Sequence, residues 1–244
     1  MQAETDEPLT LVLLCGLLCD KDIWQDVAER LRNRADIRII SFADFESIQT
    51  MAAHVLKSIP GRFALAGHSM GGRVALEVVR QDPDRVTALA LLNTGVHAPA
   101  SHELDSRSRL VKIARDRGMT ALAAEWLPPM LGRALTAEEP LMIRLTRMVE
   151  RSSPDSFAAQ IRALLHRPDA LAVLRDIRVP LLLLSASDDR WSPPKQHEAM
   201  RDSCAGSELV IVEGAGHMAP VEQPAAVAAA LRAWMNRIAP QSVA

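Results

Sequence analysis

Short apolar runs alternate with segments of helical periodicity along the first part of the chain. The runs are rich in Leu or β-branched residues, as buried strands are, and lie at 9–14, 37–40, 63–66 and 87–92. Between them, segments 23–31, 48–59 and 71–80 place apolar residues at helical spacing. Continuously apolar strands separated by amphipathic helices predict a mostly parallel sheet with helices on its faces.

The strand pattern stops after residue 95 and resumes near residue 181. Helical patterns fill the interval at 104–117, 120–126, 138–151, 155–166 and 170–177. Strands at 181–185 and 208–212 then alternate with helices at 195–202 and 225–238. We therefore predict an α/β fold with about six strands. Its core would comprise 1–95 and 179–244, and 96–178 would form an all-helical cap inserted after the fourth strand.

The segment Gly67-His68-Ser69-Met70-Gly71 joins a predicted strand directly to a predicted helix. This G-x-S-x-G pattern is typical of a serine held on a sharp, strained strand-to-helix turn, which is tolerable only if the residues around it are small. Gly67 and Gly71 are small enough. We expect the Ser69 hydroxyl to project from the carboxyl edge of the sheet as a nucleophile.

A serine nucleophile needs a base and a group that orients the base. His217 follows the last predicted strand, and Asp188 and Asp189 follow the strand before it. Because each lies just past the carboxyl end of a parallel strand, all should reach the edge where Ser69 lies. The chain order Ser, Asp, His predicts a catalytic triad that contains one of the two aspartates.

These motifs resemble the α/β-hydrolase superfamily, in the branch that holds serine esterases, enol-lactone hydrolases and cofactor-free haloperoxidases. The resemblance extends over nearly the whole chain. In that family a proline usually stands four residues after the acid, and Pro193 stands four residues after Asp189. The resemblance therefore implies Asp189 as the acid, with Asp188 as the alternative.

The resemblance also implies an oxyanion hole. By analogy its donors would be the backbone N–H groups of Leu17 and Met70. Cys15 precedes Gly16 where the family usually has a histidine, but that change leaves the backbone donors in place.

The implied reaction is acyl transfer: His217 takes the Ser69 proton, Asp189 fixes the imidazole tautomer, and water hydrolyses the acyl-enzyme. The predicted function is hydrolysis of carboxylic esters. Enol-lactones, acyl-carrier esters or thioesters and C–C bonds are alternative targets of the same machinery. A hydrolase-like receptor for small molecules is an alternative of a different class.

A cap of this kind would shape the substrate pocket. Four residues are predicted to contact substrate, namely Leu18 beside the predicted oxyanion loop, Trp126 in the most hydrophobic cap stretch, Trp191 after the acid and Met218 after the base. Their side chains favour a medium-sized apolar acyl group.

The composition of the chain limits the classes of molecule that the protein is expected to bind. The 244 residues carry a formal charge of −2 and only 3% aromatic residues, which argues against a nucleic-acid surface. The three cysteines have no framework spacing and the histidines no metal-ligand spacing, so we expect no metal, no cofactor and a reduced, cytoplasmic setting. The apolar run 9–19 follows acidic residues and is too short to span a membrane, so the expected partner is a small-molecule ester.

Overall fold

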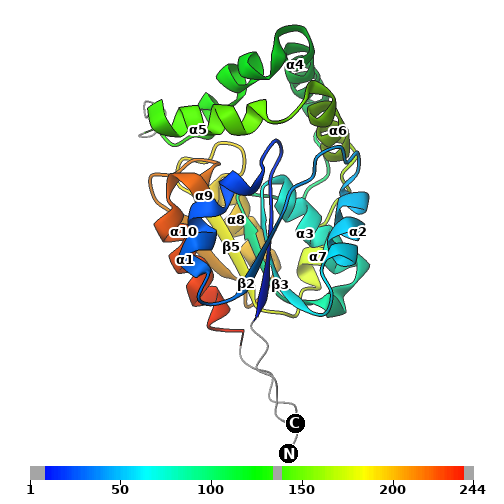
Figure 1. The fold of residues 1–244 in the computed structure, drawn as a ribbon. Coiled ribbons are helices and arrows are strands. Elements are labelled where there is room, and N and C mark those ends of the chain that lie inside the picture. The colour runs from blue at the N-terminus through cyan, green and yellow to red at the C-terminus, as the bar shows by residue number, and fades with distance from the viewer. Residues whose placement is uncertain (1–8, 134–138, 239–244) are drawn as a thin grey trace, which may run out of the picture.

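A computed structural model describes residues 9–133 and 139–238 of the protein (Figure 1). The predicted core segments at 1–8 and 239–244 lie outside the described residues, as does the predicted start of a cap helix at residue 138.

Six parallel strands form one sheet in the order β2-β1-β3-β4-β5-β6. Their bounds are β1 Thr10–Leu14, β2 Asp36–Ile40, β3 Phe63–His68, β4 Val86–Leu92, β5 Leu181–Ala186 and β6 Glu208–Val212. The central strands β3 and β5 are buried along their whole length, whereas the edge strand β2 is half-exposed. This arrangement confirms the predicted sheet and explains its sequence pattern, because a strand covered on both faces has only apolar neighbours.

Helices pack along the sheet in two groups. One group is α1 (Gln25–Leu31), α9 (Ala219–Glu222) and α10 (Pro224–Met235), and the other is α2 (Ile48–Ser58), α3 (Met70–Gln81), α7 (Leu171–Arg175) and α8 (Pro194–Ser203). Helix α7, which the sequence pattern assigns to the cap segment 96–178, packs against α3 and α8. No helix in the described ranges combines the length and the apolar character that a membrane crossing requires.

The helical insertion after β4 lies across one end of the sheet (Figure 1). It consists of α4 (Glu103–Trp126), a short turn at Pro128–Met130, α5 (Glu139–Glu150) and α6 (Pro154–Leu165). Helix α4 packs against both α5 and α6. Its helical backbone is interrupted at Gly118, whose φ of 85° and ψ of 174° are not helical, so α4 consists of two helical segments, as the patterns at 104–117 and 120–126 predict. The predicted helical insertion after the fourth strand is confirmed.

Ion pairs join the cap to the segment between β1 and β2. Arg144 of α5 binds Asp26 at 2.5 Å, and Arg151 binds Asp20 at 2.7 Å and Asp22 at 2.5 Å. These side chains are partly exposed, so each pair contributes only about 0–1 kcal/mol to stability. Their main effect is to fix where the cap rests on the core.

Candidate active site

Ser69 lies on the strained turn between β3 and α3. Its φ of 54° and ψ of −115° are unfavourable for any residue with a side chain, and the surrounding backbone must hold them in place. A Cβ added at Gly67 would come within 2.3 Å of the Gly71 carbonyl oxygen, and one at Gly71 within 2.4 Å of the Leu14 carbonyl oxygen. The turn can therefore be this tight only with glycine at both positions.

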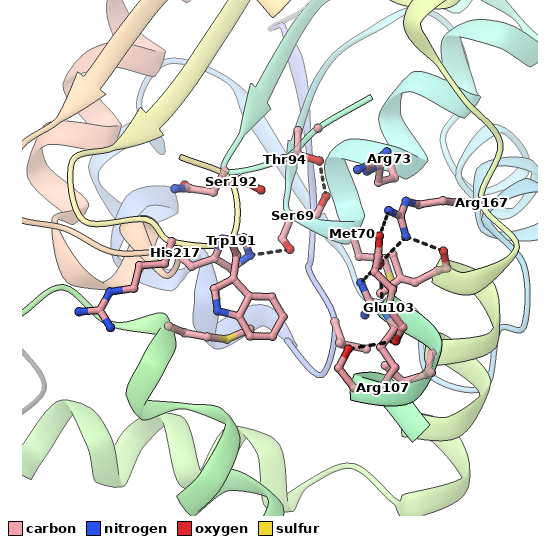
Figure 2. A pocket seen from close by; sticks show the side chains of 18 of the residues that line it. Ser69, Met70, Arg73, Thr94, Glu103, Arg107, Arg167, Trp191, Ser192 and His217 are labelled. Carbon is pink, nitrogen blue, oxygen red and sulfur yellow. Dashed lines mark hydrogen bonds and ion pairs between the residues drawn. The ribbon is translucent and has the colours of Figure 1, made fainter. Parts of the chain in front are cut away.

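The structure brings Ser69, His217 and Asp189 together in one hydrogen-bonded chain. His217 Nε2 lies 2.8 Å from Ser69 Oγ, and His217 Nδ1 lies 3.0 and 3.1 Å from the two oxygens of Asp189. Figure 2 shows the imidazole of His217 directed at the Ser69 hydroxyl. His217 and Asp189 are buried, so the chain of contacts is shielded from solvent.

The Asp189 carboxylate is held by more than His217. Oδ1 accepts the backbone N–H groups of Trp191 at 2.8 Å and Ser192 at 2.9 Å, and Oδ2 accepts the Asn93 side-chain amide at 2.9 Å. Burial by itself raises the pKa of this carboxyl, but His217 and these hydrogen bonds outweigh it and keep the pKa well below its usual range. Asp189 is therefore ionised at neutral pH and faces the imidazole with both oxygens.

Asp188 points elsewhere. Its Oδ2 accepts the backbone N–H of Arg133 at 3.0 Å, and its own N–H donates to the Ala215 carbonyl at 2.9 Å. These contacts tie the loop after β5 to the cap and to the His217 loop. Of the two aspartates left open by the sequence pattern, Asp189 is the one in contact with His217.

The loop that carries His217 is anchored by a buried carboxylate. Glu222 accepts four backbone hydrogen bonds of 2.7–3.0 Å, from the N–H groups of Gly132, Met218 and, with both oxygens, Gly216. Burial raises the pKa of Glu222, and these three N–H groups partly offset that effect. The His217 N–H also donates to the Met130 carbonyl at 2.6 Å, so the backbone of His217 is bonded to the cap as well.

Replacing Glu222 with glutamine should loosen this loop. A glutamine has one acceptor oxygen and an NH2 group that faces N–H donors, so at least one buried N–H loses its partner. We expect the free energy of unfolding to fall by about 2 kcal/mol, measured by urea denaturation. Glu198→Gln, on the exposed side of α8, is the matched control. Equal stability of both variants would contradict the anchoring role.

His68, which precedes Ser69, also holds the loop that carries His217. Its Nε2 lies 2.8 Å from the His217 carbonyl oxygen and must donate to it, while its Nδ1 has no partner in the described part of the chain. Burial, reinforced by the nearby His217, lowers the pKa of His68 to about 3. His68 is therefore neutral under ordinary conditions and holds a backbone position.

The two predicted oxyanion donors belong to residues that line the cavity above Ser69. Leu17 follows the carboxyl end of β1, and Met70 opens α3. Within residues 9–133 and 139–238, neither backbone N–H has a hydrogen-bond partner. Both donors are thus available to an oxygen atom of a bound molecule.

The cavity beside Ser69 has a volume of about 660 Å³. Three of the predicted pocket residues line it: Trp126, Trp191 and Met218. The Trp191 ring is 41% exposed and lies 6.0 Å from the His217 ring. Leu18 is not among the residues that line it; its backbone is left-handed, with φ of 56°, and its N–H donates to Gln160 at 2.9 Å.

The opposite wall of the cavity is charged, which the sequence pattern did not reveal. Arg73, Glu103, Arg107 and Arg167 line it, together with the apolar residues of the cap (Figure 2). Asn93 and Glu222 were also missed. Asn93 is the first residue after β4, and a polar residue directly after a buried strand is the signal that could have found it.

In the described ranges no group of three or more His, Cys, Asp or Glu side chains is arranged so that it could hold a metal ion. The three cysteines are buried, and burial raises the pKa of the Cys15 and Cys19 thiols. Both are therefore protonated thiols at neutral pH and poor nucleophiles.

The chain is similar to curated proteins over most of its length. The chain is 23% identical over 241 residues to the biotin biosynthesis bifunctional protein BioHC of Cellvibrio japonicus, covering 94% of this chain but 48% of that protein. It is 24% identical over 231 residues to the pimeloyl-[acyl-carrier protein] methyl ester esterase of Nitrosomonas europaea, covering 85% and 88%.

A solved structure is also similar over most of its length. The malate-bound esterase of Thermogutta terrifontis superposes with a TM-score of 0.86 at 26% identity, covering 95% of this chain and 91% of that one. The family model of the alpha/beta hydrolase family matches residues 11–230. The chain therefore belongs to the alpha/beta hydrolase family.

Proposed function

We propose that this alpha/beta hydrolase is a serine esterase that cleaves carboxylic esters through Ser69, His217 and Asp189. The observation that carries the proposal is the hydrogen-bonded chain from Ser69 Oγ through His217 to Asp189, at 2.8 and 3.0 Å. The contact between Nδ1 and the ionised Asp189 keeps the proton on Nδ1 and leaves Nε2 free to act as a base. The esterases among its relatives support the same reaction.

In the first half of the reaction a bond forms between Ser69 Oγ and the ester carbonyl carbon. The serine proton passes to His217 Nε2, and the carbonyl oxygen becomes an oxyanion that the Leu17 and Met70 N–H groups can stabilise. The bond to the leaving alcohol then breaks, and His217 returns the proton to that alcohol. An acyl group remains on Ser69.

In the second half, water attacks the acyl carbon. His217 removes a proton from the water, the bond to Ser69 breaks, and the serine takes the proton back. The products are an acid and an alcohol, and the protein returns to its starting state. The helical insertion lies across one end of the sheet, and its residues Trp126 and Met130 line the cavity through which substrate and water would reach Ser69.

A test of the proposal is covalent labelling followed in parallel with turnover. We expect a fluorophosphonate to modify Ser69 at one equivalent per chain, mapped by mass spectrometry. The rate of hydrolysis of p-nitrophenyl esters should fall in proportion to the labelled fraction. A panel of acyl lengths run on the unlabelled protein gives the preferred size.

Two results would redirect the proposal. Turnover that survives full labelling of Ser69 would refute it. Stoichiometric labelling of a protein that turns over no ester would favour the small-molecule receptor, and a ligand-dependent rise in melting temperature would then be the next observation.

A further inference from the structure

One wall of the cavity beside Ser69 holds three guanidinium groups and a single carboxylate. Arg73 comes from α3, Glu103 and Arg107 come from the first two turns of α4, and Arg167 follows α6. We refer to these four residues as the arginine wall. Figure 2 shows them gathered on one side of Ser69. Three arginines and one glutamate give the wall a formal net charge of +2.

Glu103 is already fully used. Its Oε2 accepts Arg107 at 2.9 and 3.1 Å and Arg167 at 2.9 Å, while its Oε1 accepts Arg167 at 2.6 Å and the Ala100 N–H at 3.0 Å. A carboxylate has about four acceptor positions, so these contacts exhaust it. Glu103 therefore fixes Arg107 and Arg167 in place without neutralising the wall.

Arg73 lacks a counter-ion. In the described part of the chain its one hydrogen bond runs from Nη1 to the His97 carbonyl at 2.5 Å, and no carboxylate lies within 4.0 Å. Burial, together with the charge of Arg167, lowers the pKa of Arg73 to about 9, and Glu103 and the exposed Asp169 only partly oppose this. A half-buried cation without a partner is costly unless an anion joins it.

The position of the arginine wall relative to Ser69 indicates whether the acyl group or the alcohol group of an ester would contact it. Ser69 lies between His217 and the arginine wall in Figure 2. In the proposed reaction His217 delivers its proton to the leaving alcohol, so the alcohol must lie on the His217 side. The acyl group then extends in the opposite direction, toward Arg73.

We propose that the acyl group of the preferred substrate ends in a free carboxylate that pairs with Arg73 in front of Arg107 and Arg167. The substrates would then be half-esters of dicarboxylic acids. This inference rests on the proposed function for the direction of the acyl group. Arg73 follows Ser69 by one turn of α3, an axial distance of about 6 Å, so an acid of about four to six carbons should suit the site.

The apolar pocket residues keep a role in this arrangement. Trp126, Met130 and Met218 line the same cavity and can cover the methylene groups between the two carboxyl carbons. A guanidinium binds a carboxylate through two parallel N–H donors, which also orients the chain. The pocket would therefore select a chain that is apolar in the middle and anionic at its end.

Kinetics with matched esters test the proposal. The probes are the monomethyl esters of succinic, glutaric, adipic and pimelic acids, each compared with its dimethyl ester, in which the carboxylate is masked. We expect kcat/KM to favour the monomethyl ester by about tenfold or more at the best length, as for a charge-assisted pair. Equal or better hydrolysis of the dimethyl ester at every length would overturn the proposal.

Substitutions of single arginines test whether Arg73 causes the preference for the monomethyl ester. Arg73→Gln should lower the ratio of monomethyl to dimethyl kcat/KM about tenfold, and Arg73→Lys should restore part of it. Arg109→Gln, on the exposed side of α4, is the matched control and should leave the ratio unchanged. An unchanged ratio in a folded Arg73→Gln protein would overturn the assignment.

A measurement of ligand binding without turnover tests the carboxylate site independently of the proposed esterase reaction. Titration calorimetry of monomethyl glutarate with Ser69→Ala should show saturable binding, weakened at least tenfold when Arg73→Gln is added. If the wild-type protein hydrolyses no ester but this binding is seen, the esterase proposal fails and the carboxylate site stands. If dimethyl esters are hydrolysed but the half-ester does not bind, the carboxylate site fails alone.

Discussion

Replacing Ser69 with alanine is expected to lower kcat for ester hydrolysis by about five orders of magnitude. The alanine removes the only atom that can form the acyl-enzyme, so what remains is oxyanion stabilisation and substrate positioning around a water attack. The strained turn does not depend on the hydroxyl, because its hydrogen bonds are made by the Ser69 backbone N–H and carbonyl. Stability should therefore change little. Stopped assays of enzyme at high concentration, run over hours, measure the residual rate.

A serine on the surface of α8 provides the control. Within the part of the chain that the structure describes, the Ser203 hydroxyl bonds only the Ala199 carbonyl, so Ser203→Ala should keep wild-type kcat. A Ser69→Ala protein that retains more than about one per cent of wild-type kcat after contaminating esterase is excluded would be incompatible with the acyl-enzyme.

Replacing Asp189 with asparagine should lower kcat by about three to four orders of magnitude. An asparagine amide can donate to His217 Nδ1, which would put the imidazole proton on Nε2 and leave no base for Ser69. The backbone N–H groups of Trp191 and Ser192 would keep an oxygen acceptor, so the loop should remain in place. Raising the pH should restore part of the rate, since hydroxide can take over proton removal.

The same substitution at the neighbouring Asp188 is the control for Asp189→Asn. Asp188→Asn changes the same chemical group one residue away, but its contact is the Arg133 N–H, which an amide oxygen can also accept. We expect kcat within about threefold of wild type, since a surface-type substitution of this kind changes free energies by less than about 0.5 kcal/mol. Larger loss from Asp188→Asn than from Asp189→Asn would reverse the assignment of the acid.

The fold could be predicted from the sequence because buried parallel strands leave a simple pattern. The run 63–66 and the structural β3 Phe63–His68 differ only at the carboxyl end, where Gly67 and His68 still pair with β4. The Ser69, Asp189 and His217 contacts were predictable for a related reason. Each residue lies one to five positions after the end of a strand, and parallel strands bring those positions to one edge.

The arginine wall and Glu222 could not be predicted in the same way. Arg73 and Arg167 are 94 positions apart in the sequence. Their proximity depends on where the cap is placed relative to α3, which no local pattern encodes. Leu18 shows the converse error. Leu18 follows the cavity residue Leu17 in sequence, but its backbone is left-handed and its N–H donates to Gln160 of α6.

The hydrogen bond from the His217 N–H to the Met130 carbonyl has a consequence for how the cap can move. Glu222 bonds Gly132 two residues further along the chain, so this part of the cap is held beside His217. The cap is also held at its other end, where Gln160 of α6 accepts the Leu18 N–H and donates to the Phe42 carbonyl. A displacement of the cap at Met130 would therefore move the His217 backbone and disturb its contact with Ser69, so this corner must stay in place during the proposed proton transfer.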